Sequence, residues 1–274
     1  MGLTKKKRFY KIVSDIKNVK IQGASSIAKA ALAAYHLFPS RKTRKILLDS
    51  RPTEPMMDRV LQMAEKYPYG KIIKHFSYAQ EKINRFVFGL IKNDRVIFTH
   101  CHSTNVSRAL IYSHKKGKRF EVYTTETRPL YQGRKTASEL RKAGIKVTMF
   151  VDSGFAMALE KENKKDRIYA DKVFLGADAL LKEGIINKIG SKTVAELAKI
   201  HKIPFYIAAD SWKFTKRKVP IEQRNLNEVW DKAPRNIKIR NPAFEFVHKK
   251  YTTGIITELG LMKYSTFVRR ISKR

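Results

Sequence analysis

From about Asp94 onwards, short apolar runs alternate with amphipathic stretches of roughly helical length. The apolar runs are RVIFTH, RFEVYTTE, KVTMFVD, DKVFLGAD, PFYIAAD and TGIITELG. The stretches between them are NVSRALIYSHKKG, GRKTASELRKAG, SGFAMALEKEN and GSKTVAELAKIHK. Continuous apolar strands separated by helical periods are typical of βαβ units, so the pattern predicts a parallel sheet covered on both faces. Ligands of such sheets bind in a crevice beyond the carboxyl ends of the strands.

The preceding residues, from 5 to about 92, have helical patterns instead. GASSIAKAALAAYHLF is rich in alanine, and TEPMMDRVLQMAEKY has an apolar face, with Thr53 in position to cap the helix. We therefore expect an α/β protein with a small helical N-terminal domain over residues 1–92 and a parallel-sheet domain over residues 93–274. The basic segment KYSTFVRRISKR at the end is expected to be frayed.

The charge balance is unusual, with 58 Lys and Arg against 24 Asp and Glu, a formal net charge of +34. Such a charge attracts nucleic acids and steers anionic substrates. The lysines are spread through every segment, which favours a general lysine bias over one basic binding face. Nucleic-acid binding therefore rests on charge alone.

The cysteine content and the hydropathy of the sequence indicate in which cellular compartment the protein is expected. A single cysteine excludes an internal disulfide, and no apolar run approaches the roughly 20 residues that span a bilayer. The N-terminal lysines are not followed by the apolar segment of a secretory signal. We expect a cytoplasmic protein without a membrane partner.

Polar side chains follow nearly every expected strand, and Cys101 is the most reactive of them. It lies where a strand leads into a helix, and helix N-termini favour a thiolate or a neighbouring phosphate. A buried, inert cysteine is equally compatible with this position. A metal site is disfavoured, because His100 and His102 alternate faces with Cys101 and no second Cys/His cluster completes a ligand set.

Asp178 follows the strand in KVFLGAD. Desolvation there would raise the pKa of its carboxyl group and suit it to proton transfer, although capping the next turn is an equal alternative. Further on, Asn187, Lys188, Gly190 and Ser191 open a helix and can form a phosphate cradle. Two further cations, Arg51 and Lys213, could contribute to phosphate binding.

Several strings together resemble one protein family. They are THCHS, TTETRPLYQGRKTASEL, VFLGADALLKEGIINKIGSKTVA, PFYIAADSWKF and NPAFEFVHKKYTTGIITELG, and they cover roughly residues 20 to 262 in matching order. The family joins regulatory subunits of translation initiation factor 2B to isomerases of methylthioribose 1-phosphate and of ribose 1,5-bisphosphate. The resemblance implies a helical N-terminal domain, a Rossmann-like second domain, and homodimers or dimer-based hexamers.

The resemblance also implies site residues. The isomerases use a cysteine after the TH strand and an aspartate in GAD, which match Cys101 and Asp178. The implied substrate or phosphate contacts are Gly23, Ala24, Arg51, Asn187, Lys188 and Lys213. Two residues depart from the pattern. Gln22 replaces the arginine of an Arg-Gly-Ala string. This change removes a cationic contact to a substrate phosphate unless Lys20 substitutes for it. Asp210 replaces the usual glutamate.

The string TETRPLYQGR is closer to archaeal ribose 1,5-bisphosphate isomerases, so the resemblance favours an aldose–ketose isomerase that forms ribulose 1,5-bisphosphate in AMP breakdown. By the family's chemistry, Asp178 moves the ring-oxygen proton and the Cys101 thiolate takes the C2 proton, without a redox cofactor or a metal. The alternative is a non-catalytic regulatory subunit that binds initiation factor 2 or a nucleotide. Retention of both Cys101 and Asp178 favours the enzyme, whereas Gln22 favours the regulatory subunit.

Overall fold

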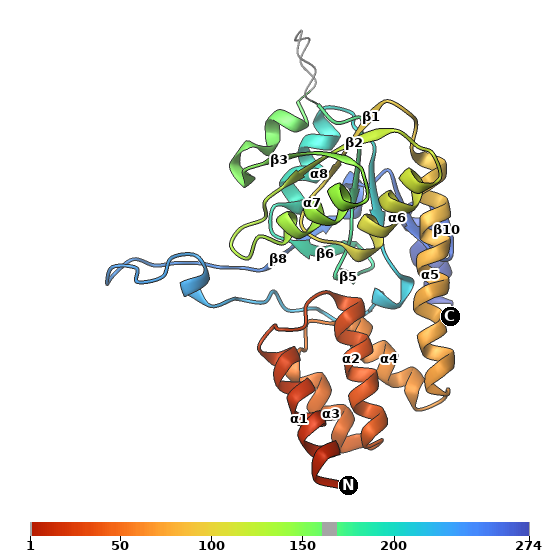
Figure 1. The fold of residues 1–274 in the computed structure, drawn as a ribbon, viewed down its shortest axis with the longest axis vertical. Coiled ribbons are helices and arrows are strands. Elements are labelled where there is room, and N and C mark those ends of the chain that lie inside the picture. The colour runs from red at the N-terminus through yellow and green to blue at the C-terminus, as the bar shows by residue number, and fades with distance from the viewer. Residues whose placement is uncertain (1, 161–168, 274) are drawn as a thin grey trace.

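The N-terminal part of the chain is a bundle of helices (Figure 1). The computed structural model describes residues 2–160 and 169–273, and the bundle consists of α1 (Gly2–Lys17), α2 (Ala24–Leu37), α3 (Arg41–Ser50), α4 (Pro55–Ala64) and α5 (Tyr69–Leu90). Four alanines of α2 are buried and allow close helix packing, namely Ala24, Ala28, Ala31 and Ala34. Pro55, with its fixed φ, occupies the first turn of α4. The predicted cap by Thr53 is wrong, because Glu54 holds the N-cap position.

Helix α5 belongs to two apolar cores. Ile72 and Phe76 near its start pack in the bundle with α2 and α4, whereas Ile83 and Val87 near its end pack against the sheet and its helices. One helix therefore ties the two parts together. A domain boundary at residue 92 stays a prediction, because α5 contributes to both sides of it.

The second part is built on a seven-stranded sheet in the order β10-β9-β7-β4-β1-β2-β3. Its strands are β1 (Arg95–Thr99), β2 (Phe120–Thr125), β3 (Lys146–Phe150), β4 (Lys172–Leu175), β7 (Phe205–Ala208), β9 (Gly254–Thr257) and β10 (Gly260–Met262). All neighbouring pairs are parallel except β9 and β10, which are antiparallel. The predicted parallel sheet is confirmed, with one antiparallel edge strand.

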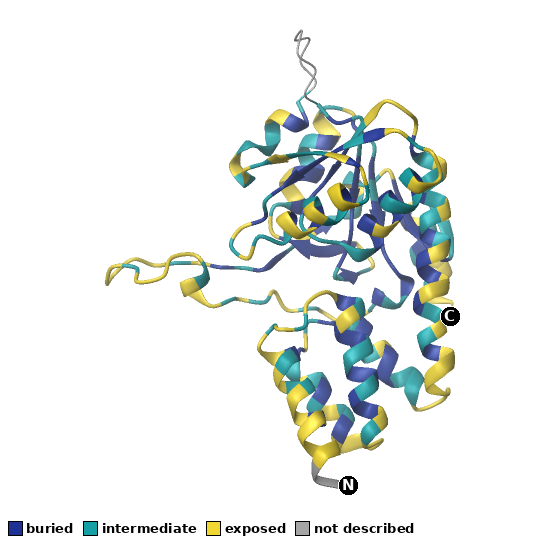
Figure 2. Ribbon diagram, in the orientation of Figure 1, coloured by how far each residue is buried: buried dark blue, intermediate teal, exposed yellow. Residues whose placement is uncertain are grey.

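Helices cover both faces of this sheet, and its inner strands are mostly buried, whereas the edge strands β3 and β10 are more exposed (Figure 2). One face packs against α5, α6 (Thr104–Lys115) and α7 (Gln132–Lys142), and the other against α8 (Ser191–Ile200) and α9 (Tyr264–Ser272). The expected α/β class, with a helical N-terminal part and a Rossmann-like second part, is therefore confirmed.

The strand order reverses at β1. After β1 the chain adds β2 and β3 on one side, and it then returns to place β4 on the other side of β1. Helix α6, which follows β1, and helix α8, which follows the β4 region, lie on opposite faces of the sheet. The two connections diverge, so a crevice opens beyond the ends of β1 and β4.

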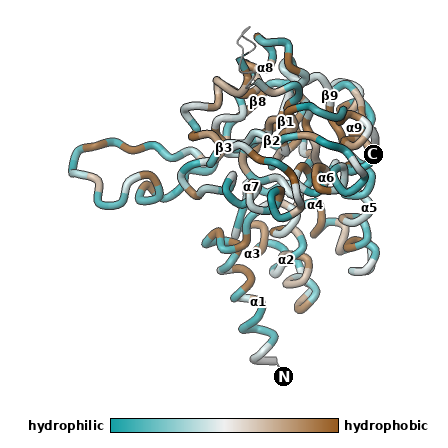
Figure 3. Tube along the Cα trace, turned by 45° about the horizontal axis from the view of Figure 1, so that its top comes forward, coloured by the Kyte–Doolittle hydropathy of each residue, from teal (hydrophilic) through white to brown (hydrophobic). Residues whose placement is uncertain are grey.

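Two features were not expected from the sequence. A small antiparallel sheet, in the order β5-β6-β8, is formed by β5 (Ala179–Leu180), β6 (Gly184–Lys188) and β8 (Phe244–His248). Residues 215–243, here called the arm, extend away from the body of the molecule before the chain enters β8 (Figures 1 and 3). The arm exposes several apolar side chains, among them Val229, Trp230 and Ile237.

Two expectations about local structure need correction. The stretch SGFAMALEKEN forms a 3₁₀ helix over Asp152–Ala158 rather than an α-helix, and its last residues lie outside the described part. The C-terminal segment is not frayed, because α9 buries Tyr264 and Phe267 against the sheet. Across residues 2–160 and 169–273, none of the helices combines the length and the apolar character required to cross a membrane.

Helix α9 provides a test of the fold. Phe267 is fully buried and packs edge-on against Phe214 and Tyr264. We expect Phe267→Ala to lower the free energy of unfolding by about 3–5 kcal/mol, because truncating a core phenylalanine leaves a cavity. Urea unfolding followed by circular dichroism measures the change. The control Ser265→Ala, at an exposed position of the same helix, should stay within about 0.5 kcal/mol. Equal stability of the two variants would contradict the packed helix.

Candidate active site

One cavity beyond the ends of β1 and β4 contains the expected catalytic pair and the six substrate or phosphate contacts that the resemblance implies. Its wall includes Cys101 and Asp178, and it also includes all the expected substrate contacts, namely Gly23, Ala24, Arg51, Asn187, Lys188 and Lys213. The helical part supplies the first three contacts, and the α/β part supplies the rest. The cavity therefore lies between the two parts of the chain, and the roles of these residues stay predictions.

Cys101 lies just beyond β1 in a left-handed backbone conformation, with φ of 66°. This conformation costs a non-glycine residue about 1–3 kcal/mol and must be held by its surroundings. The Cys101 N–H donates to Thr127 Oγ1 at 3.1 Å, and the Cys101 carbonyl accepts from Thr136 Oγ1 at 2.8 Å. Cys101 as a residue is partly buried, and it lines the cavity rather than the apolar core.

The Cys101 thiol is protonated at neutral pH. Burial raises its pKa to about 11, the nearby charges of Asp178 and Asp152 add to the increase, and the charge of Lys188 opposes it. The sequence left two alternatives open, a buried, inert cysteine and a thiolate favoured by the start of the following helix. Desolvation outweighs that effect, because the charged form of the thiol loses more hydration than the helix start returns.

Asp178 follows β4 and faces the same cavity. Its backbone N–H donates to the Ile186 carbonyl at 2.9 Å, which fixes the loop against β6. Burial raises the pKa of its carboxyl group, and the positive charges of Lys213, Lys188 and Arg51 limit the increase. Gly176 allows this loop to approach α6, because a Cβ there would lie 2.4 Å from Ser103 Oγ.

Two lysines are held with their ammonium groups at the cavity. Lys213 is buried in a short 3₁₀ turn, and its Nζ donates to the Ala177 carbonyl at 2.6 Å. Lys188 ends β6, and its Nζ lies 5.1 Å from the centre of the Phe244 ring. Both charges lower the pKa of the Asp178 carboxyl group. An ammonium group carries three donors, so each lysine retains capacity to bind an anion.

The helix start at this cavity is not the predicted one. Gly190 and Ser191 begin α8, but neither is among the described residues on the cavity wall, and the buried Ser191 hydroxyl bonds to Asn187 and the Lys188 carbonyl. The first turns of α2 and α6 line the cavity instead, through residues that include Ala24 and Thr104. Helix N-termini favour anions, so these two provide the effect expected of α8.

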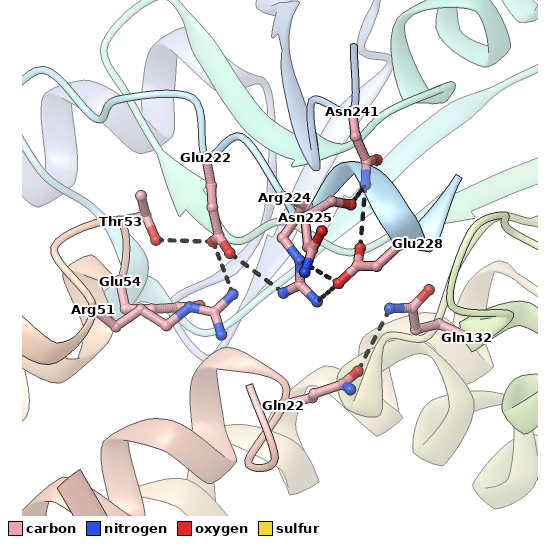
Figure 4. Close-up of polar contacts among 10 residues, drawn as sticks. All are labelled: Gln22, Arg51, Thr53, Glu54, Gln132, Glu222, Arg224, Asn225, Glu228 and Asn241. Atoms are coloured by element: carbon pink, nitrogen blue, oxygen red, sulfur yellow. Dashed lines mark hydrogen bonds and ion pairs between the residues drawn. The ribbon is translucent and has the colours of Figure 1, made fainter. Parts of the chain in front are cut away.

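Arg51 is buried and paired with carboxyl groups (Figure 4). Its Nη2 donates to Glu222 Oε2 at 2.9 Å, and its Nε lies 3.7 Å from Glu54 Oε1. Glu222 belongs to the arm and also accepts from Arg224, which in turn pairs with Glu228. Arg51 Nε and Nη1 are buried without a hydrogen-bond partner among the described residues. The arm thus reaches the cavity, and Arg51 retains free donors there.

Several residues of the wall were not predicted as site residues from the sequence: Glu54, His100, Gln132, Lys135 and Arg224. His100 is neutral, since burial lowers its pKa, and it donates from Nε2 to the Ile189 carbonyl while Nδ1 accepts from Thr125. The string QGRKTASEL contains Gln132 and Lys135, but nothing in it shows that these side chains reach the cavity rather than solvent.

The surroundings of Gln22 bear on whether Lys20 can substitute for the missing arginine. Gln22 accepts a hydrogen bond from Gln132 Nε2 at 3.5 Å, at the open side of the cavity (Figure 4). Lys20 is not among the described wall residues, whereas Lys135 from α7 is. Among the described residues, Lys135 therefore shares the cavity wall with Gln22, whereas Lys20 does not.

Asp210 is not among the described residues of the cavity wall and belongs to a second polar cluster. His75, Asp210 and Glu258 form a group of side chains whose ligand atoms lie within 4.8 Å of one another, as a metal site requires. Each already has protein partners: His75 Nε2 lies 3.0 Å from Asp210 Oδ1, and Glu258 accepts from Ser211. Asp210 also accepts from the Trp212 N–H, so it shapes the turn that carries Lys213.

Comparisons with known proteins find relatives over most of this chain. A profile of the initiation factor 2 subunit family matches residues 21–264. Ribose 1,5-bisphosphate isomerase from Methanocaldococcus jannaschii is 33% identical over 90% of this chain and 89% of its own. Methylthioribose-1-phosphate isomerase from Thermosipho melanesiensis is 32% identical over 97% and 90%. The crystal structure of the Pyrococcus horikoshii translation initiation factor eIF-2B superposes with a TM-score of 0.80 at 26% identity, over 93% of this chain and 97% of that one.

The single thiol allows a direct test of the site's electrostatics. Iodoacetamide reacts with the thiolate, so we expect alkylation of Cys101 to be slow at pH 7 and to rise about tenfold per pH unit up to pH 10. Lys188→Met should slow alkylation further, because the lost positive charge lets the thiol pKa rise. Lys192→Met, at an exposed position, serves as the control. A rate that levels off below pH 9 would contradict the raised pKa.

Proposed function

This chain belongs to the initiation factor 2 subunit family, and on that premise we propose that it is a sugar-phosphate isomerase that converts ribose 1,5-bisphosphate to ribulose 1,5-bisphosphate in AMP breakdown. Similarity to curated isomerases over most of both chains supports an isomerase. Four relatives are ribose 1,5-bisphosphate isomerases with 31–33% identity, which favours the bisphosphate as substrate.

The observation that carries the proposal is the cavity shared by Cys101 and Asp178. A thiol and a carboxyl group with a raised pKa lie on one wall together with cationic side chains that include Arg51, Lys188 and Lys213. An aldose–ketose isomerisation needs proton carriers beside the sugar carbons and donors for the anionic groups. A pure binding protein has no evident use for both proton carriers.

The reaction only redistributes protons, because substrate and product are isomers. The ring oxygen and C1 each gain a proton, whereas C2 and its hydroxyl group each lose one. In our proposal Asp178 gives its proton to the ring oxygen and later takes the hydroxyl proton. The Cys101 thiolate takes the C2 proton and returns it to C1. Since the resting group is a thiol, turnover uses a minor thiolate population, which the charge of Lys188 enlarges.

The cations have separate tasks in this proposal. Arg51, Lys188 and Lys213 hold phosphate groups and stabilise the enediolate that forms between the two proton transfers. The backbone at Gly23 and Ala24 supplies donors from the start of α2. Asn187 orients a sugar hydroxyl group, and its amide is itself held by Ser191 Oγ at 2.8 Å.

A second candidate is a regulatory subunit that binds initiation factor 2 or a nucleotide. Gln22 in place of an arginine and the pairing of Arg51 with Glu222 favour it, because both reduce the positive charge available to a phosphate. Retention of initiation factor 2 in a pulldown at moderate salt would support this candidate. The salt matters, because a protein with a net charge of +34 binds anions without specificity.

We also propose that the chain forms homodimers or hexamers. The arm supports this, because it extends away from the chain's own body and exposes apolar side chains such as Trp230 and Ile237. Light scattering should give a mass of at least twice the 31.7 kDa of one chain. A monomer at micromolar concentration would contradict the assembly.

The isomerase proposal is tested by incubating the pure protein with ribose 1,5-bisphosphate and following ribulose 1,5-bisphosphate by phosphorus NMR. We expect Cys101→Ser and Asp178→Asn each to lower turnover by about 10²–10⁴-fold, because each removes a proton carrier. Methylthioribose 1-phosphate, assayed in parallel, should react more slowly. Wild-type protein that is no faster than either variant would rule out the catalytic proposal.

A further inference from the structure

Glu54 is a buried carboxyl group in the cavity for which the reaction just proposed has no use. It follows Arg51-Pro52-Thr53 directly and is only 4% exposed. It occupies the N-cap position of α4, where a carboxylate usually accepts a backbone N–H, yet its side chain makes no capping hydrogen bond. Helix capping therefore does not explain an acidic residue here.

One oxygen of Glu54 has no interaction that would account for its burial. Oε1 lies 3.7 Å from Arg51 Nε, whereas Oε2 is buried without a hydrogen-bond partner among the described residues. Arg51 Nε and Nη1 are orphaned in the same way beside it (Figure 4). Buried polar atoms are nearly always hydrogen-bonded, so unpaired donors and an unpaired carboxyl oxygen on one cavity wall point to a polar ligand.

The surroundings of Glu54 favour its neutral acid form. Burial and the charge of Asp178 raise its pKa to about 8, Glu222 of the arm acts in the same direction, and Arg51 and Lys213 oppose the increase. The other titratable groups on the wall are His100, Cys101, His102, Lys135, Lys188 and Arg224. At pH 7 the group is mostly a carboxylic acid and can donate a hydrogen bond, whereas a carboxylate only accepts one.

We propose that Glu54 is a substrate-contacting residue: as an acid it donates a hydrogen bond to an oxygen of the sugar phosphate beside Arg51, and as a carboxylate it excludes that anion. The inference rests on the proposed function, because it takes the ligand to be a sugar phosphate. We therefore expect the cavity to bind the sugar phosphate only when the Glu54 carboxyl group carries a proton. Ionised Glu54 repels the phosphate and also competes with it for the free donors of Arg51.

The proposal is tested by the binding of ribose 5-phosphate, measured by calorimetry at pH 7 and pH 9. Its phosphate monoester stays dianionic over this range, because its second pKa is about 6. If only protein with protonated Glu54 binds, affinity falls about tenfold from pH 7 to pH 9. Glu54→Gln keeps a donor without the charge, so it should bind within about threefold of wild type at pH 7 and lose the pH dependence.

Two further variants separate the outcomes. Glu54→Leu removes the donor and should bind ribose 5-phosphate at least tenfold more weakly than wild type at pH 7. The control Glu65→Gln removes a partly exposed carboxylate of the same bundle and should keep the wild-type pH dependence. Thermal unfolding checks that each variant is folded. The inference is overturned if Glu54→Gln keeps the wild-type pH dependence or if Glu54→Leu binds like wild type.

This experiment also separates the two proposals. Binding of ribose 5-phosphate requires no turnover. If Glu54→Gln abolishes the pH dependence of binding but the wild-type protein shows no isomerase activity, only the catalytic proposal is rejected. Wild-type activity with an unchanged pH dependence in Glu54→Gln would reject only the role of Glu54. A wild-type protein that does not bind the probe at pH 7 would overturn both.

Discussion

The adjacency of β1 and β4 at the reversal of strand order is the constraint on which the rest of the site depends. Each strand ends in a residue of the expected pair, Cys101 after β1 and Asp178 after β4, and the two strands are hydrogen-bonded neighbours. Because α6 and α8 leave toward opposite faces, nothing from the sheet fills the space between these ends. Gly176 then lets the loops approach closely. The helical part closes the remaining side, held by α5, which packs in both cores.

Charge compensation decides what this crevice can bind. The buried Arg51 and Lys213 must be paired or hydrogen-bonded, since an isolated buried charge is strongly destabilising. Glu222 partly neutralises Arg51, and the Ala177 carbonyl accepts from Lys213. The described cavity wall carries five cationic side chains, Arg51, Lys135, Lys188, Lys213 and Arg224, and two carboxyl groups, Glu54 and Asp178. Burial raises the pKa of both carboxyl groups, to about 8 for Glu54, so Glu54 is mostly neutral at pH 7 and the wall favours an anion. The net charge of +34, spread over the surface, has no such specificity.

The sequence predicted most helices and strands, but it did not predict which side chains contact one another in the folded chain. Strand ends with polar residues identified Cys101 and Asp178, because the ends of parallel strands meet at one edge of a sheet. Glu54 could not be found in this way, because an acid before Pro55 is indistinguishable from a helix cap until the structure shows its burial beside Asp178. The thiol's high pKa also depends on its three-dimensional surroundings. Helix α9 was missed although Tyr264, Phe267, Val268 and Ile271 have helical spacing, because its basic residues suggested a solvated tail.

The central claim is that one bound sugar phosphate lies against both the thiol and the carboxyl group. Protection of the single cysteine tests it most directly, with alkylation by a maleimide at pH 7.5 in the Asp178→Asn variant, where turnover does not consume the ligand. The account predicts that ribose 1,5-bisphosphate slows modification of Cys101 in a saturable manner. An alkylation rate that is unchanged at saturating ligand would contradict it.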